Sequence, residues 1–221
     1  MTAKPPKVGR TEKSPLSREE TDQFLTSLRK EKPILFPLYH FWLDTGLRHG
    51  ELLGCKWEHL KGDRYHVEEQ LMRDGSFDAP KDESYGEVAL STVTIEALES
   101  FRQGEIERRK LTEPPRTGLI WCRPDGGHLN YRTEANILGR LLKAAGIESR
   151  TPHELRHTAA TLMFSDGASV IQVQHQLRHS RPSITLDHYG HLLPKDLRPV
   201  FSVVPNAVLT PEAARLTGTD G

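Results

Sequence analysis

Apolar residues recur at helical spacing over much of this chain, and the points where that spacing begins and stops predict the elements. Ser17 and Glu20 have the spacing of a capping box and should start the first helix. A second helix is expected over residues 33–44, ended by Gly46, and a short third helix over residues 48–54. The N-terminal part of the fold is therefore predicted to be helical.

Between residues 63 and 90 the pattern changes to short β-rich runs. The runs RYHVEEQL, SFDAPK and GEVALS are separated by the turn signals DG and YG, which predicts a small antiparallel sheet. Helices resume over residues 92–108 and 131–145, on either side of a loop rich in Pro and Gly at 112–130. The expected fold class is α+β, mainly α-helical, with a small antiparallel β-sheet.

The segment TPHELRH predicts another helix start, because Thr151, Pro152 and Glu154 fit the N-cap, N1 and N3 positions. At the angular spacing of a helix, this segment has a polar face and an opposite apolar face, and we expect the apolar face to pack inward. The polar face holds His153, Arg156 and His157, and the apolar face holds Leu155, Ala159 and Leu162. Two imidazoles and a guanidinium beside a helix N-terminus favour the binding of an anion.

Two further helices, joined by a turn, are predicted downstream. Ser169 and Gln172 have capping-box spacing for the first helix, and Pro182 suits the first turn of the second. His179 falls in the turn, and Tyr189 ends the second helix. The pair resembles a helix–turn–helix, but nothing in it marks side chains that read bases, so a recognition helix is only weakly indicated.

The letters HELRH also satisfy the H-E-x-x-H pattern of zinc hydrolases. The continuation argues against that interpretation, because Ala160 and Met163 stand where one zinc-protease class needs glycine and histidine. Another class needs a later glutamate as third ligand, and none occurs between Glu154 and Glu212. Zinc hydrolysis is therefore a remote alternative, and no metal site is expected.

The composition is that of a soluble globular protein, with 36% hydrophobic and 27% charged residues among 221. Thirty basic and thirty acidic side chains cancel, so the whole chain has no charge signature of nucleic-acid binding. A local basic groove could still bind phosphates. No run of about 18 apolar residues is present, so no membrane span is expected. Cys55 and Cys122 are outside metal-ligand spacing, which fits free thiols in a reducing cytoplasm.

Four segments together resemble the catalytic domain of the tyrosine recombinases, the phage-integrase family. They are TGLRHGELLGCKW, APKDESYGEVALS, TPHELRHTAATLM and LRHSRPSITLDHYGHL, in the family's order. The resemblance implies a catalytic domain over residues 16–193, after a flexible basic linker at 1–15. A tail at 194–221 is expected to dock on a neighbouring subunit. Relatives carry an N-terminal core-binding domain for which this chain has no room, so an isolated catalytic fragment or a truncated recombinase is expected.

The resemblance implies a role for individual positions, with Tyr189 as the nucleophile. The implied catalytic residues are Arg48, Lys81, His153, Arg156, His179 and Tyr189. Glu51 is implied to brace Arg48, and His157 is implied to support the site. The family's LGH triplet reads LRH here, so that Arg178 replaces glycine and is expected, with Arg181, to contact DNA.

In the implied reaction Tyr189 attacks the scissile phosphate, giving a 3′-phosphotyrosyl bond and a free 5′-hydroxyl. The arginines would hold the non-bridging oxygens, Lys81 would protonate the departing 5′ oxygen, and His153 would take the tyrosine proton. Because the new ester retains the energy of the old one, no ATP, metal or other cofactor is expected.

The implied partner is double-stranded DNA, bound by a homotetramer that brings two recombination sites together, with a monomer when free. The expected location is the cytoplasm of a bacterium, with a bacterial or phage gene. Two alternatives use the same fold: a DNA-binding module that does not cut, and an activity like that of a type IB topoisomerase.

Overall fold

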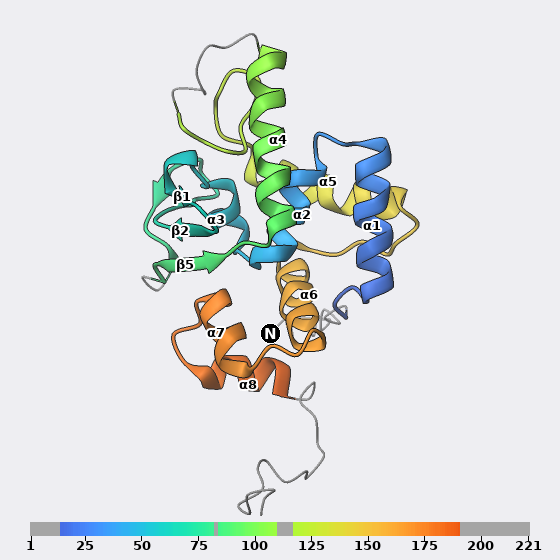
Figure 1. Ribbon diagram of the computed structural model, residues 1–221, viewed down its shortest axis with the longest axis vertical. Helices are drawn as coiled ribbons and strands as arrows, with labels where there is room; N and C mark the ends of the chain where they lie inside the picture. Colours follow the sequence, from blue (N-terminus) through green and yellow to red (C-terminus); the bar gives the residue numbers. More distant parts are fainter. Residues whose placement is uncertain (1–13, 82–83, 110–116, 191–221) are drawn as a thin grey trace, which may run out of the picture.

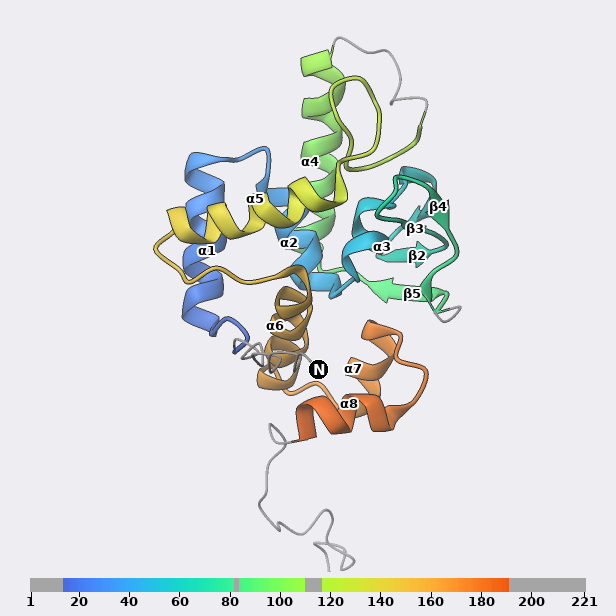
Figure 2. The same cartoon turned by 180° about the vertical axis from the view of Figure 1, so that it is seen from behind.

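The computed structural model describes residues 14–81, 84–109 and 117–190 (Figures 1 and 2). The expected tail at 194–221 lies outside the described residues, as does the expected linker at 1–15 apart from its last two positions. Within the described residues the chain is mainly helical with short antiparallel strands, which confirms the predicted fold class. No described helix is long and apolar enough to cross a membrane.

The first helices follow the signals predicted from the sequence. Helix α1 (Arg18–Glu31) begins with the expected capping box, in which the Ser17 hydroxyl accepts from the Glu20 amide and the Glu20 carboxylate accepts from the Ser17 amide. Helix α2 (Phe36–Thr45) starts three residues later than predicted and ends at Gly46, which adopts the left-handed conformation with φ 62°. The short helix α3 (His49–Leu53) follows at once, so Arg48 lies at its N-cap.

Helix α2 lies at the centre of the hydrophobic core. Its Tyr39, Phe41 and Trp42 are almost completely buried. The ring of Phe24 in α1 packs 5.4 Å from that of Tyr39, and the ring of Trp121 packs 5.8 Å from that of Phe41. Helix α2 contacts α1, α4 (Thr92–Arg109) and α6 (Pro152–Ser165), while α5 (Tyr131–Ala144) packs beside α1 (Figure 1). The core therefore fixes the end of α2, where the residues of the site begin.

The predicted small antiparallel sheet is present, and its strands are divided between a three-stranded sheet and a separate two-stranded one. One sheet has the antiparallel order β1 (Leu60–Lys61), β2 (Arg64–Val67), β5 (Gly86–Ala89). The other pairs β3 (Gln70–Leu71) with β4 (Phe77–Asp78). Strand β3 packs against α3, where a Cβ at Gly50 would lie 2.7 Å from the Leu71 carbonyl oxygen. This close backbone contact holds the β3–β4 hairpin on α3.

The last three helices form a smaller unit that approaches β5 from below in Figure 2. Helix α6 begins with the predicted capping box of Thr151 and Glu154 and with Pro152 in its first turn. Helices α7 (Val170–Leu177) and α8 (Pro182–Tyr189) follow as predicted, with their own small core. The buried members of that core are Ala160, Val173, Leu177 and Tyr189, and Met163, Phe164 and Ala168 pack against them.

The predicted faces of α6 were partly wrong. Leu155 and Ala159 are buried as expected, but Leu162 is only partly buried. Arg156, assigned to the outward polar face, is also buried, with 5% of its surface exposed. The reason is that α7 and the end of α2 cover this side of α6 and supply carbonyl groups for the guanidinium.

Candidate active site

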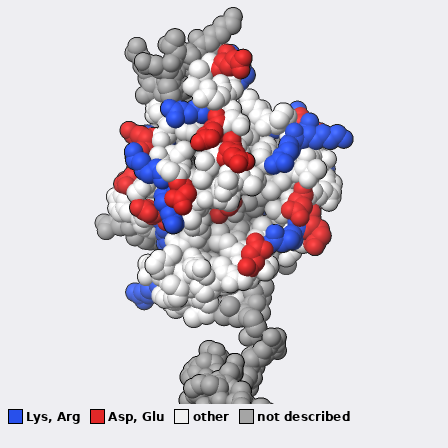
Figure 3. Space-filling view, viewed as in Figure 1, with Lys and Arg blue, Asp and Glu red and all other residues white. Residues whose placement is uncertain are grey.

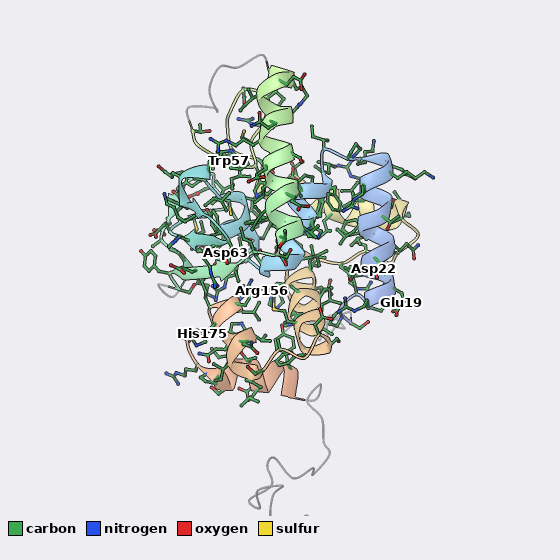
Figure 4. All side chains as sticks on the ribbon, in the orientation of Figure 1. Glu19, Asp22, Trp57, Asp63, Arg156 and His175 are labelled. Atoms are coloured by element: carbon green, nitrogen blue, oxygen red, sulfur yellow. The ribbon has the colours of Figure 1, made fainter. Side chains whose placement is uncertain are left out.

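The candidate catalytic residues lie around one cavity of about 1490 Å³ between the sheet, α6 and the α7–α8 unit. Figure 4 shows Arg156 at the junction of α6, α7 and β5. Of the positions singled out from the sequence, the cavity wall includes Arg48, Lys81, His153, Arg156, Arg178 and His179. These residues are far apart in the chain and come from α3, the β4–β5 connection, α6 and the α7–α8 turn. The fold thus gathers several cationic or hydrogen-bonding side chains at one concave surface.

Glu51 holds Arg48 at the N-terminus of α3. One carboxylate oxygen accepts from Nη1 of Arg48 at 2.8 Å, and the other accepts from the Arg48 backbone N–H at 2.8 Å. Glu51 itself is 1% exposed. Nη1 of Arg48 also donates to the hydroxyl of Ser84 at 2.7 Å. The predicted contact between Glu51 and Arg48 is present, and it leaves the Arg48 side chain part-exposed at the cavity.

A second guanidinium, that of Arg178, reaches the same carboxylate. Its Nη2 is paired with Glu51, and its Nε donates to the Ser84 carbonyl oxygen at 3.1 Å. Burial opposes the ionisation of Glu51, but the positive charges of Arg178, Arg48 and Arg156 outweigh it and lower its pKa. The Arg178 side chain is thus turned inward and bound to protein groups, and its expected contact with DNA stays a prediction.

Arg156 joins the ends of two helices. Its Nη1 donates to the carbonyl oxygen of Gly46 at 2.7 Å, and its Nη2 donates to that of Leu177 at 2.6 Å. Burial, together with the nearby positive charge of Arg48, lowers its pKa to about 9, so the guanidinium is still charged at neutral pH. A buried, fixed cation of this kind holds the cavity wall together and attracts an anion into it.

The hydroxyl of Tyr189 lies against a pair of histidines. It is 2.5 Å from Nδ1 of His157, and Nε2 of His157 is 2.8 Å from Nε2 of His153. Tyr189 is 4% exposed, and burial raises its pKa to about 12 against the opposing charge of Arg156. His153 is among the residues that line the cavity, whereas Tyr189 and His157 are not. The Tyr189 hydroxyl is therefore in contact with the imidazole of His157, which in turn contacts His153, and the expected role of His153 as proton acceptor stays a prediction.

The α7–α8 turn presents His179 to the cavity. Its Nδ1 is 2.9 Å from the hydroxyl of Thr185, and its backbone carbonyl accepts from the Gln174 amide at 3.1 Å. If the Thr185 hydroxyl donates to Nδ1, the proton of the neutral imidazole lies on Nε2. Lys81 is exposed and lines the same cavity from the β4–β5 connection. Arg181 is exposed at the N-cap of α8, outside the cavity lining.

Ser84 was missed by the sequence reasoning, although it contacts both Arg48 and Arg178. The available signal was its place three residues after Lys81 in the hairpin segment.

Among the described residues no three His, Cys, Asp or Glu side chains gather as metal ligands, and the two histidines of HELRH contact each other. On the face drawn in Figure 3 the acidic and basic side chains are interspersed, in keeping with the zero net charge.

The chain matches the Phage integrase family over residues 12–196, and it belongs to that family. It is 27% identical over 205 residues to a XerC-like tyrosine recombinase of Caldanaerobacter subterraneus, covering 84% of this chain and 52% of that protein. It is 31% identical over 160 residues to tyrosine recombinase XerC of Corynebacterium glutamicum, covering 72% of this chain and 46% of that protein. The chain thus spans about half the length of these relatives.

The fold is also that of solved members of this family. The Tn1549 transposon integrase, in complex with transposon right end DNA, superposes with a TM-score of 0.68 at 25% identity. The match covers 82% of this chain and 63% of the integrase chain. The resemblance seen in the four sequence segments is therefore confirmed at the level of family and fold.

Proposed function

We propose that this chain is the catalytic part of a site-specific DNA recombinase that cuts and rejoins strands through a 3′-phosphotyrosyl intermediate. The observation that carries the proposal is the single cavity bordered by Arg48, Arg156 and Lys81, with Tyr189 joined to its wall through two histidines. The Tyr189 hydroxyl is in contact with an imidazole nitrogen that could take its proton, as a tyrosine nucleophile requires.

Each cation has a distinct task in this proposal. Arg48 and Arg156 bind the non-bridging oxygens of the scissile phosphate, where negative charge gathers in the transition state. The Nε2–H of His179 donates to the same oxygens. The bond from phosphorus to the 5′ oxygen breaks as the bond to Tyr189 forms, and the ammonium of Lys81 gives the departing oxygen its proton.

The proton of Tyr189 leaves through the histidine pair. A phenol whose pKa is about 12 is almost wholly protonated at neutral pH, so attack requires a base in contact with it. His157 accepts this proton at Nδ1 and releases the one on Nε2 to His153. The net result is that Tyr189 loses one proton and His153, on the cavity wall, gains one. His157 is neutral before and after the transfer.

Double-stranded DNA is the proposed partner. The local charge supports this, because Arg48, Arg156 and Arg178 surround one buried carboxylate and exceed it in charge. The DNA bound by the similar Tn1549 integrase also supports it. We further propose a homotetramer on two recombination sites and a monomer when free, with Arg181 as a phosphate contact at the start of α8.

Trapping a covalent adduct tests the proposal. The chain is incubated with a pool of duplexes that carry a single nick and randomised flanking sequence, and any linked peptide is mapped by mass spectrometry. The expected adduct is on Tyr189, and Tyr189→Phe should abolish it while DNA binding survives. Tyr39→Phe, which removes a hydroxyl from another buried tyrosine, is the matched control and should form the adduct.

Two rival functions give different outcomes. A DNA-binding module of the same fold would bind the pool and give no adduct with the unaltered chain. A type IB topoisomerase-like protein would give the Tyr189 adduct and also relax supercoiled plasmids of unrelated sequence. Adducts enriched for one flanking sequence, without general relaxation, are the outcome expected of a site-specific recombinase.

A further inference from the structure

Arg178 adopts a backbone conformation that arginine rarely adopts. It is the C-cap of α7 with φ 53° and ψ 45°, and it is the only non-glycine residue with positive φ in the described parts of the chain. For a residue with a Cβ this left-handed conformation costs about 1 kcal/mol or more. The side chain must therefore make contacts that offset this cost.

Those contacts link three separate segments. The guanidinium pairs with Glu51 of α3 and donates from Nε to the Ser84 carbonyl oxygen in the β4–β5 connection. The aliphatic part of the side chain packs on Gly86, where an added Cβ would lie 3.3 Å from Cδ of Arg178. Since His179 follows Arg178 directly, the turn that carries this histidine is tied to both α3 and the β4–β5 connection.

Ser84 connects Arg178 to Lys81 through hydrogen bonds. Its carbonyl accepts from Arg178, its hydroxyl accepts from Arg48, and its backbone N–H donates to the Lys81 carbonyl oxygen at 3.3 Å. Lys81 is exposed and lines the cavity, and its backbone carbonyl is held by this hydrogen bond from Ser84. A group that acts as an acid must be held close to the atom it protonates, and loss of that position slows proton transfer.

We propose that Arg178 is a positioning residue that presents Lys81 to the leaving group, by holding the Ser84 backbone against Glu51 and the α7–α8 turn. The inference rests on the proposed function and deepens it. It assigns Arg178 an internal role in delivering the proton, in place of the expected DNA contact. Glycine, which the family resemblance implies for this position, has no side chain and could not make these contacts.

The first measurement, hydrogen exchange, tests the contacts of Arg178 without any DNA cleavage. Hydrogen exchange is followed by mass spectrometry in the unaltered chain and in Arg178→Gly and Arg178→Lys. Arg178→Gly relieves the backbone strain and removes the contacts, so peptides spanning residues 77–89 should exchange at least about tenfold faster, with α2 and α4 unchanged. Arg178→Lys, which keeps the charge but cannot bridge both partners, should be intermediate. Unchanged exchange over 77–89 would overturn the proposal.

The second measurement separates proton delivery from phosphate binding. Single-turnover cleavage is compared on an adduct-forming duplex with the ordinary 5′ oxygen and on one with sulfur at that bridging position. A thiolate leaves without a proton, since thiols have a pKa near 8.5. Arg178→Gly should cleave the oxygen substrate about 100-fold more slowly, in the range of lost acid catalysis, and the sulfur substrate at close to the unaltered rate. Lys81→Ala should show the same pattern, and Lys30→Ala, on the exposed end of α1, should be unchanged on both.

The outcomes distinguish the failure of this inference from that of the proposed function. An equal loss on both substrates, with weaker DNA binding, would show that Arg178 acts on the phosphate through its buried Nη1, and would overturn the positioning role. If the unaltered chain forms no adduct with either substrate, the proposed recombinase activity fails, and the positioning role in proton delivery fails with it. The exchange measurement would then still report whether Arg178 holds the β4–β5 connection.

Discussion

His49 is predicted to make the fold sensitive to acid. The ring is buried at the start of α3, stacked on Trp42 at 5.2 Å and tilted against Tyr131 at 4.3 Å between ring centroids. Among the described residues neither ring nitrogen has a hydrogen-bond partner. Burial lowers the pKa of His49 to about 4, because an imidazolium in this position would lose its hydration without gaining an acceptor.

The sign and size of the effect follow from the difference in pKa between the two states. A histidine in an unfolded chain has a pKa near 6.5. Between this value and the lower folded pKa, His49 is protonated in the unfolded state but neutral in the folded state. The contribution of His49 to stability is complete above pH 6.5 and is lost progressively as the pH falls toward the folded value. With folded and unfolded pKa values of about 4 and 6.5, the loss between pH 7.5 and pH 4.5 is about 2.5 kcal/mol.

His49→Phe isolates this contribution, because phenylalanine keeps the aromatic packing and does not titrate. Urea unfolding at pH 7.5 and 4.5 gives the free energy of unfolding for both proteins. The acid-induced loss should be smaller in His49→Phe by about 2.5 kcal/mol, which corresponds to roughly 5–10 °C in Tm for a chain of this size. Equal acid-induced losses in the two proteins would refute the reasoning, since other titrating groups contribute alike to both.

Two more predictions concern the site. Glu51→Gln removes the buried carboxylate that lies between the guanidiniums of Arg48 and Arg178. Urea titration at pH 7 should show that the free energy of unfolding falls by about 3–5 kcal/mol, because two buried cations lose their counter-charge. A loss below about 1 kcal/mol would mean that other groups compensate these cations. His157→Phe keeps a ring against Tyr189 but removes the acceptor, so adduct formation at pH 7 should slow by about 100-fold and recover in part at higher pH. A rate that is slowed equally at every pH would instead indicate a packing defect.

Local signals allowed much of the fold to be predicted from the sequence. The capping boxes at Ser17 and Thr151, and the glycine after α2, act through neighbouring residues, so short segments contain the information needed to place them. The start of α2 was misplaced because Leu35 makes no side-chain cap, which left Pro33 as the clearest signal. The division of the strands into two sheets depends on how β3 meets α3, and no local pattern encodes that contact.

The site was predicted as a set of residues but not as a network. Candidate members could be named because the family resemblance identifies positions. The inward turn of Arg178 and the burial of Arg156 could not, because their partners are carbonyl and carboxylate groups from distant segments. The same holds for the contact of Tyr189 with His157, which depends on how α8 crosses α6. Amphipathic patterns describe which face is apolar, and they carry no information about a cation that is buried against backbone oxygens.

The concentration of guanidinium groups at one hollow has a consequence for how a polyanion encounters this molecule. Because the chain as a whole is neutral, the proposed duplex partner would gain little from long-range attraction to it. Attraction becomes appreciable only within about one Debye length of the basic hollow, roughly 8–10 Å at cellular salt. For the proposed DNA partner, orientation would therefore select the productive encounters.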